Sequence, residues 1–118
     1  MNSLNLAFLG DAVHTLFIRS KFVTDDLTAG SLHRMSAKYC KASAQSEALK
    51  KIEPILTEEE REVVRKARNA KTHDAPKNAT LVDYKRATCF EALVGYLYIS
   101  KNFNRLEEIL NKTLEELT

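Results

Sequence analysis

Two carboxylates interrupt otherwise apolar stretches of the sequence, and both could do chemistry. Asp11 lies within NLAFLGDAVHTLFI (residues 5–18), and Glu91 lies within TCFEALVGYLYI (88–99). An unpaired charge removed from water costs several kcal/mol, so each acid needs a compensating partner. At helical spacing, only His14 could pair with Asp11, and no base lies within one turn of Glu91.

Two explanations are open for these acids. Each could pair with a Lys or Arg from a distant part of the fold, or a divalent cation could lie between the two carboxylates. Gly10 and Gly95 stand close to the acids and would let two helices approach closely. Oxygen ligands without a His/Cys cluster favour Mg²⁺ or Mn²⁺ over Zn²⁺. Asp11 and Glu91 are therefore candidate metal ligands and candidate catalytic residues.

A basic segment points to a polyanionic partner. Residues 65–86 contain seven Lys or Arg and two Asp, a net charge of +5, whereas the rest of the 118-residue chain carries −3. A solvated basic surface would explain the same pattern. Combined with a site for Mg²⁺, the segment favours phosphodiester chemistry on nucleic acid.

The other reactive side chains form no catalytic pattern. The three histidines lack ligand spacing, and we expect His14 to pack within the helices or lie near Asp11. The two cysteines have no CxxC spacing, so we expect both Cys40 and Cys89 to be small buried residues in a reducing cytosol. The tyrosines expected to pack in the core are Tyr84, Tyr96 and Tyr98.

The elements that position these residues are all predicted to be helices. The expected helices span residues 4–22, 28–52 in two pieces that meet near 39–42, 57–69, 80–100 and 103–117. The capping residues at their starts are Asn2 or Ser3, Thr57 with Glu60, and Thr80 or Asn78. Glu53 and Pro54 end the second region, and residues 69–80 form the longest loop. The prediction is an all-α protein, a compact helical bundle with a single domain over residues 1–118.

Composition excludes several classes of protein. With 44% hydrophobic and 29% charged residues, the chain has the composition of a soluble globular protein. No segment stays apolar for the ~18 residues that a membrane span needs. The first residues lack a basic leader and a cleavage site for a signal peptide. We therefore expect a cytoplasmic protein with no membrane partner.

Several motifs resemble one nuclease family. LAFLGDAV (6–13) resembles the ribonuclease III signature, and CFEALVGYLY (89–98) resembles that family's second catalytic segment. The likeness is closer still to Mini-III, the bacterial group of that family without a double-stranded-RNA-binding domain. Residues 32–49, 57–71 and 76–98 each resemble Mini-III segments in the same order, so the resemblance covers essentially the whole chain.

This resemblance implies the fold of a ribonuclease III catalytic domain and a homodimeric endonuclease that hydrolyses double-stranded RNA with Mg²⁺, or with Mn²⁺ as a substitute. It also implies a role in maturing the precursor of large-subunit ribosomal RNA. Asp11 matches the family's catalytic aspartate, and Glu91 matches its catalytic, metal-binding glutamate. Ala7 and Thr88 stand where ordinary ribonuclease III has two further acids, so the number of metal ions is open.

The loop and its neighbours are the expected RNA surface. A-form duplexes are recognised through their backbone and 2′-hydroxyls, which Lys, Arg and Asn side chains suit. His73 lies in the same loop and could touch RNA. The candidate RNA-binding residues are Arg65, Arg68, Lys71, Lys77, Asn78, Lys85 and Arg86.

A dimer needs an interface, and the first and long helices have more apolar faces than one core can cover. We expect this interface around Phe8, Ala12 and residues 90–97.

Two other functions are open: a catalytically silent RNA-binding or ribosome-assembly module, and a purely structural helical dimer. Retention of both acids argues against the first, and the basic segment argues against the second.

Overall fold

The computed structural model describes residues 1–71 and 79–115, and every regular element in these ranges is a helix. The elements are α1 (Ser3–Phe22), α2 (Ala29–Cys40), α3 (Ala42–Ile52), the 3₁₀ helix η1 (Glu53–Ile55), α4 (Glu58–Asn69), α5 (Leu81–Ile99) and α6 (Phe103–Thr113). The predicted all-α fold is confirmed. None of the described helices combines the length and apolar character that crossing a membrane requires.

The helices begin at capping residues that the sequence predicts. The side chains of Asn2, Thr57 and Thr80 each accept a hydrogen bond from the backbone N–H three residues later. At α4 the Glu60 carboxylate also accepts from the Thr57 N–H at 2.9 Å, which completes the capping box. Side-chain caps therefore fix where three of the helices start.

The structure refines one predicted helix boundary and corrects another. The break expected between residues 39 and 42 lies at Lys41, whose extended backbone separates α2 from α3. α6 ends at Thr113 instead of continuing to 117, and Leu117, predicted to contribute to its apolar face, lies outside the described residues.

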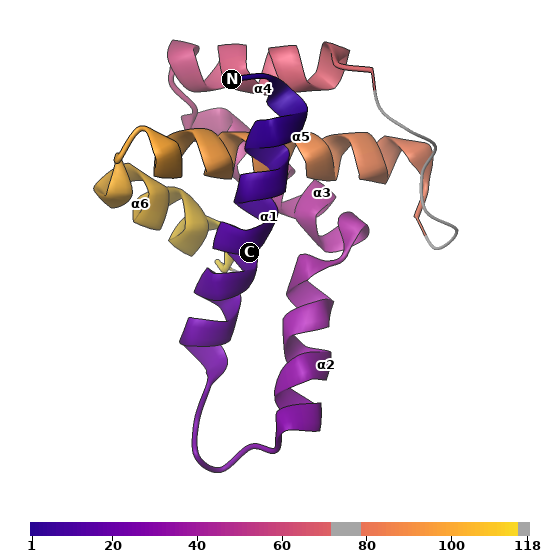
Figure 1. The fold of residues 1–118 in the computed structure, drawn as a ribbon, viewed down its shortest axis with the longest axis vertical. Coiled ribbons are helices and arrows are strands. Elements are labelled where there is room, and N and C mark those ends of the chain that lie inside the picture. The colour runs from indigo at the N-terminus through magenta and orange to yellow at the C-terminus, as the bar shows by residue number, and fades with distance from the viewer. Residues whose placement is uncertain (72–78, 116–118) are drawn as a thin grey trace.

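The long helix α5 lies at the centre of the molecule. α1 crosses its near side, and α3 and α4 also pack against it (Figure 1). The second half of α1 pairs with α2 in a hairpin that extends away from the rest of the bundle (Figure 1). Phe90, Leu93 and Val94 of α5 are fully buried, so the core is built around this helix.

The surplus apolar face predicted over residues 90–97 is therefore wrong. Apart from Glu91 and Tyr96, which are half-buried, all these side chains are buried within the chain. The reason is that helices cover α5 on several sides, so an all-round apolar helix is satisfied without a partner. Of the predicted interface, the exposed apolar part lies on α1, where Phe8 is 85% exposed.

Four side chains, one cysteine and three tyrosines, are less buried than predicted. Cys89 is buried, but Cys40 is half-buried near the Thr15 hydroxyl, which is 3.8 Å from its sulfur. Tyr84 and Tyr96 are half-buried, whereas Tyr98 is exposed at the end of α5 and packs edge-on against Phe103.

α1 and α5 cross with their backbones in contact. A Cβ atom on Gly10 would lie 1.7 Å from the carbonyl oxygen of Glu91, and one on Gly95 would lie 2.0 Å from the carbonyl oxygen of Leu6. Both distances are far inside van der Waals contact, so even a methyl group would force the helices apart. This crossing positions the first acid, Asp11, beside the second.

We predict that Gly10→Ala and Gly95→Ala each lower the free energy of unfolding by about 2–4 kcal/mol, because rigid backbone opposes the added methyl. Urea denaturation measures the loss. Gly30→Ala is the matched control: its Cβ would meet nothing closer than the Arg34 side chain at 3.6 Å. In exposed α2 it should stabilise by about 0.5–1 kcal/mol. Equal stability of Gly10→Ala and Gly30→Ala would contradict the close crossing.

Candidate active site

The structure brings Asp11 of α1 and Glu91 of α5 together at the helix crossing. Glu91 interacts directly with the Asp11 carboxyl through hydrogen bonding and charge repulsion. Asp11 is exposed and Glu91 is half-buried, so the expectation that Asp11 is buried is wrong. Asp11 lies one helical turn after the exposed Phe8 on α1. The cost of removing a charge from water therefore falls mainly on Glu91.

The environment of Glu91 favours its protonated form. Burial raises the pKa of the Glu91 carboxyl to about 8, and the neighbouring Asp11 carboxyl contributes in the same direction. Hydrogen bonding from the Gln45 amide acts in the opposite direction and lowers this pKa. Without a cation, the two acids therefore do not both carry a full charge at neutral pH.

No Lys or Arg among the described residues forms an ion pair with either acid. The six ion pairs of the described chain join other carboxylates, such as Glu60 with Arg105 and Glu53 with Arg86. The explanation by a distant base therefore has no support in the described ranges.

The donor set of the acid pair suits a hard divalent cation. Two carboxylates would supply oxygen ligands, and a cation would relieve the repulsion between Asp11 and Glu91. Residues 1–71 and 79–115 contain no cluster of three or more His, Cys, Asp or Glu able to hold a metal. An ion at this site would therefore keep several water or substrate ligands, which is usual for Mg²⁺.

A neutral polar pair lies behind the acids. His14 of α1 and Gln45 of α3 are each 2% exposed, and the Gln45 Nε2 is 3.1 Å from the His14 Nδ1. Burial lowers the pKa of the His14 imidazole to about 4, although the Asp11 charge acts in the opposite direction. His14 packs edge-on against Phe90, with ring centroids 5.0 Å apart. The prediction that His14 packs within the helices is confirmed.

Sequence reasoning missed Gln45. Its position carried a signal, because Gln45 lies on the same helical face as Leu49 and Ile52, four and seven residues later. Both of these are core residues, so an amide on this face had to be buried and hydrogen-bonded.

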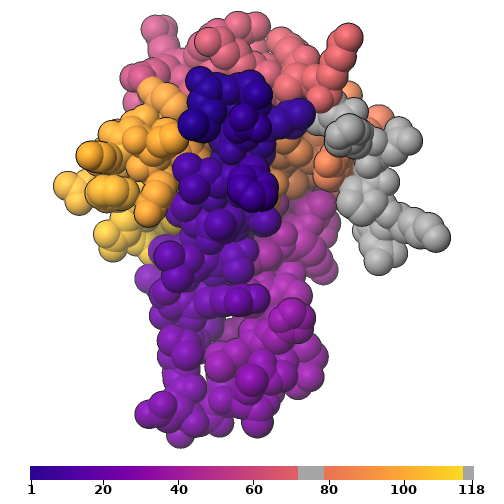
Figure 2. All heavy atoms as spheres, in the orientation of Figure 1, coloured from indigo at the N-terminus to yellow at the C-terminus, as the bar shows by residue number. Residues whose placement is uncertain are grey.

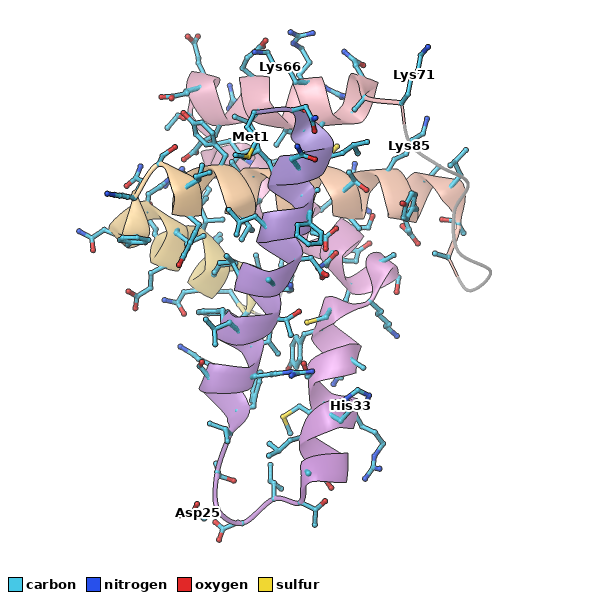
Figure 3. The ribbon with its side chains drawn as sticks, viewed as in Figure 1. Met1, Asp25, His33, Lys66, Lys71 and Lys85 are labelled. Atoms are coloured by element: carbon cyan, nitrogen blue, oxygen red, sulfur yellow. The ribbon has the colours of Figure 1, made fainter. Side chains whose placement is uncertain are left out.

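The predicted RNA-binding residues fall into three groups. Arg68, Lys71 and Lys85 are exposed, and Figure 3 shows Lys71 and Lys85 at the same end of the α4 and α5 layer. Two others are engaged within the chain: Arg65 pairs with Glu62, and Arg86 bonds Glu53 and Ser46. Lys77 and Asn78, together with His73, lie outside the described residues.

A cleft of about 290 Å³ lies between these basic side chains. Arg68 of α4 and Lys85 and Arg86 of α5 line it, and Glu53 contributes one opposing charge. The apolar residues that line the same cleft are Leu49, Val64, Val82 and Cys89. Lys85 precedes Glu91 by six residues, or about 9 Å along the helix axis, but at 3.6 residues per turn the cleft-lining residues Lys85, Arg86 and Cys89 project from a different side of α5 than Glu91.

Comparison with known proteins agrees on one family. The family model of the ribonuclease III domain matches residues 4–102 of this chain. The Mini-ribonuclease 3 of a Thermoanaerobacter species is 44% identical over 98% of this chain and 82% of its own length. That of Symbiobacterium thermophilum is 45% identical over 91% of this chain and 83% of its own. A crystal structure of a protein from Fusobacterium nucleatum superposes with a TM-score of 0.86 at 34% identity, covering 94% of this chain and 89% of the other.

We predict that the metal-free protein loses stability as the pH rises from about 6.5 to 8, whereas below 6.5 the lowered pKa of His14 acts in the opposite direction. Between 4.5 and about 8, folded Glu91 holds a proton that the unfolded chain has released. In this window the contribution of Glu91 to the stability of the folded protein therefore falls as the pH rises. Glu91→Gln should remove this dependence and stabilise the metal-free protein at pH 8 by about 1–3 kcal/mol. Thermal unfolding in chelator at several pH values measures both effects.

The control is Glu107→Gln, which neutralises an exposed carboxylate on α6. It should leave the slope of stability against pH unchanged. A Glu91→Gln variant with the wild-type slope would contradict the protonation assigned to Glu91.

Proposed function

Since this chain belongs to the ribonuclease III family, within its Mini-ribonuclease 3 group, and is therefore an endoribonuclease, we propose that it cleaves double-stranded RNA using Mg²⁺ held by Asp11 and Glu91. The observation that carries the proposal is the meeting of these two carboxylates at the crossing of α1 and α5, with no cation from the described chain paired to either. Mn²⁺, with similar ligand preferences, is expected to substitute.

The two acids have different tasks in this proposal. A bound Mg²⁺ would supply activation of water and stabilisation of the leaving oxygen. Exposed Asp11 faces the side from which RNA must approach. Half-buried Glu91 gives up its proton when a cation binds, because the positive charge reverses the effect of burial and of Asp11. Binding of the ion should therefore release a proton near neutral pH.

The buried histidine is not proposed as an acid or base. His14 is 2% exposed, and its lowered pKa keeps the imidazole neutral at the pH at which RNA is cleaved. A side chain enclosed in this way cannot reach a scissile phosphate. The chemistry therefore depends on the two carboxylates.

The proposed RNA surface is the basic region beside the cleft between α4 and α5. Arg68, Lys71 and Lys85 are exposed and suit the phosphates and 2′-hydroxyls of an A-form duplex. Arg65 and Arg86 belong to the same surface, but each would have to leave or share an acidic partner. Lys77 and Asn78 complete the predicted set. Binding through such charges weakens steeply as salt concentration rises.

Cleavage of both strands requires two acid pairs, and we propose that a homodimer supplies them. α1 lies across the near face of the molecule in Figure 2, and its outer side carries Phe8 (85% exposed), Ala12 and Leu16 (64% exposed). A second copy across this face would bury the apolar stripe by two-fold symmetry. Asp11 follows Phe8 by one turn, so the same contact would bring both acid pairs to one RNA duplex.

The proposed substrate is the precursor of large-subunit ribosomal RNA, processed in the cytoplasm, as the likeness to Mini-III implies. The alternative is a catalytically silent RNA-binding or ribosome-assembly module. It would need neither the acid pair nor a cation, and one experiment separates the two functions.

We predict that the purified protein cleaves a long RNA duplex in Mg²⁺, that chelation stops cleavage, and that Mg²⁺ or Mn²⁺ restores it. Asp11→Asn and Glu91→Gln should each reduce the rate by about 10³-fold or more, because an ion at such a site contributes several kcal/mol to the transition state. Gel analysis of the products measures the rates, and Glu107→Gln should cleave as wild type. Binding of the duplex without cleavage by the wild type would favour the silent module.

We predict a homodimer of about twice 13.4 kDa at micromolar concentration, measured by sedimentation. Phe8→Asp should give monomers that no longer make double-strand breaks, because a charge replaces the apolar centre of the interface. Phe103→Asp places the same charge at a 53% exposed phenylalanine of α6 and should remain dimeric. A Phe8→Asp dimer with wild-type mass would refute this interface.

A further inference from the structure

The side chain of Gln45 ends in a polar amide, yet it is buried in the core. It lies on α3 and is 2% exposed, so its donors and acceptor must find partners inside the protein. No buried side-chain nitrogen or oxygen of the described residues lacks a partner, so these requirements are met. A buried polar group that costs free energy to enclose calls for a function beyond packing.

Its partners lie on two other helices. The Nε2 is 3.1 Å from His14 Nδ1 on α1, and the same side chain is close enough to the Glu91 carboxyl on α5 to lower its pKa by hydrogen bonding. An amide nitrogen carries two N–H donors, so it can serve both partners at once. Gln45 therefore links the elements that carry the two acids, since Asp11 is on α1 and Glu91 is on α5.

The imidazole of His14 determines how the Gln45 amide is oriented. A neutral imidazole has one accepting and one donating nitrogen, and Nδ1 faces the Gln45 Nε2, so Nδ1 accepts and the proton lies on Nε2. The ring is held by burial and by its edge-on contact with Phe90. A fixed acceptor on one side turns the second N–H of the amide toward Glu91.

Resting on the proposed function, we propose that Gln45 is a positioning residue: its amide, oriented by neutral His14, holds the Glu91 carboxylate in place for the divalent cation. Hydrogen bonding from Gln45 lowers the pKa of the Glu91 carboxyl, whereas the adjacent Asp11 carboxyl raises it. A donor on the buried side favours the ionised carboxylate and limits its rotation. Outer partners of this kind typically contribute 10–100-fold to metal affinity or activity.

The test uses Gln45→Met, which keeps the length and bulk of the side chain and removes both donors. Mn²⁺ binding to the protein without RNA should weaken about 10–100-fold. With RNA and saturating Mg²⁺, kcat should fall while KM for the duplex stays unchanged, because Gln45 is 2% exposed and cannot itself contact RNA. The ¹⁵N NMR signals of His14 should lose the hydrogen-bonded Nδ1 shift seen in the wild type.

Two further variants separate positioning from stability. Thr113→Val removes another buried hydrogen bond, from the Thr113 hydroxyl to the Leu110 carbonyl on α6, and should lower stability without changing Mn²⁺ affinity. Gln45→Asn keeps the amide but is one methylene too short to serve both partners. It should fold even if Gln45→Met does not, and weaken Mn²⁺ binding in the same direction.

The outcomes are distinct. Wild-type Mn²⁺ affinity and kcat in a folded Gln45 variant would overturn the proposal, as would an equal loss of Mn²⁺ affinity in Thr113→Val. A wild-type ¹⁵N spectrum that places the His14 proton on Nδ1 would also overturn it. Failure of the wild type to cleave RNA would refute the proposed function instead, while Mn²⁺ binding and the NMR signals would still report on Gln45.

Discussion

The contact of two helix backbones at Gly10 and Gly95 is the constraint on which the rest of the structure depends. Helices with side chains at these positions would cross farther apart, because a single Cβ already overlaps a carbonyl oxygen of the opposite helix. The close crossing makes neighbours of Asp11 and Glu91, two acids that are eighty positions apart in the sequence. It also lets α5 bury most of its surface between Ala87 and Leu97, since α1 covers one side while α3 and α4 cover others. Glycine is thus required for geometry here, in spite of its cost to helix stability.

The same crossing creates an electrostatic imbalance. Asp11 remains in contact with water, whereas Glu91 is half-buried with an acid as its neighbour, and its pKa rises to about 8. The polar groups behind it are neutral: His14, with a pKa lowered to about 4, and the amide of Gln45. A cationic partner there would have satisfied Glu91 as a structural ion pair, as Arg105 satisfies Glu60. Because His14 and Gln45 are neutral, the negative charge of Glu91 remains available to an external cation. The metal-free protein is less stable as a result.

The fold was largely predictable because its signals are local. Caps at Asn2, Thr57 and Thr80 and the apolar periodicity set the helix order without tertiary information. The candidate acids were also visible, since a lone carboxylate in an apolar stretch needs no structure to be noticed. The predictions that failed concerned exposure: Asp11 is exposed on α1, and the apolar residues of α5 between 90 and 97 are enclosed by the chain itself. Sequence periodicity gives the faces of a helix but not the neighbours that cover them. Gln45 was missed for the same reason, because its partners come from two other helices.

Each side of α1 has a different role. One side, with Gly10, contacts α5, and the side with His14 meets α3 through Gln45. The outer side, with exposed Phe8, meets no other described element of this chain. Asp11 lies at the boundary between the covered and the exposed sides. A shift of α1 on its outer side therefore changes the distance between the acids on its inner side, because a helix moves as a rigid body. If a second copy covers Phe8, as proposed, dimerisation and the geometry of the acid pair are mechanically coupled through this one helix.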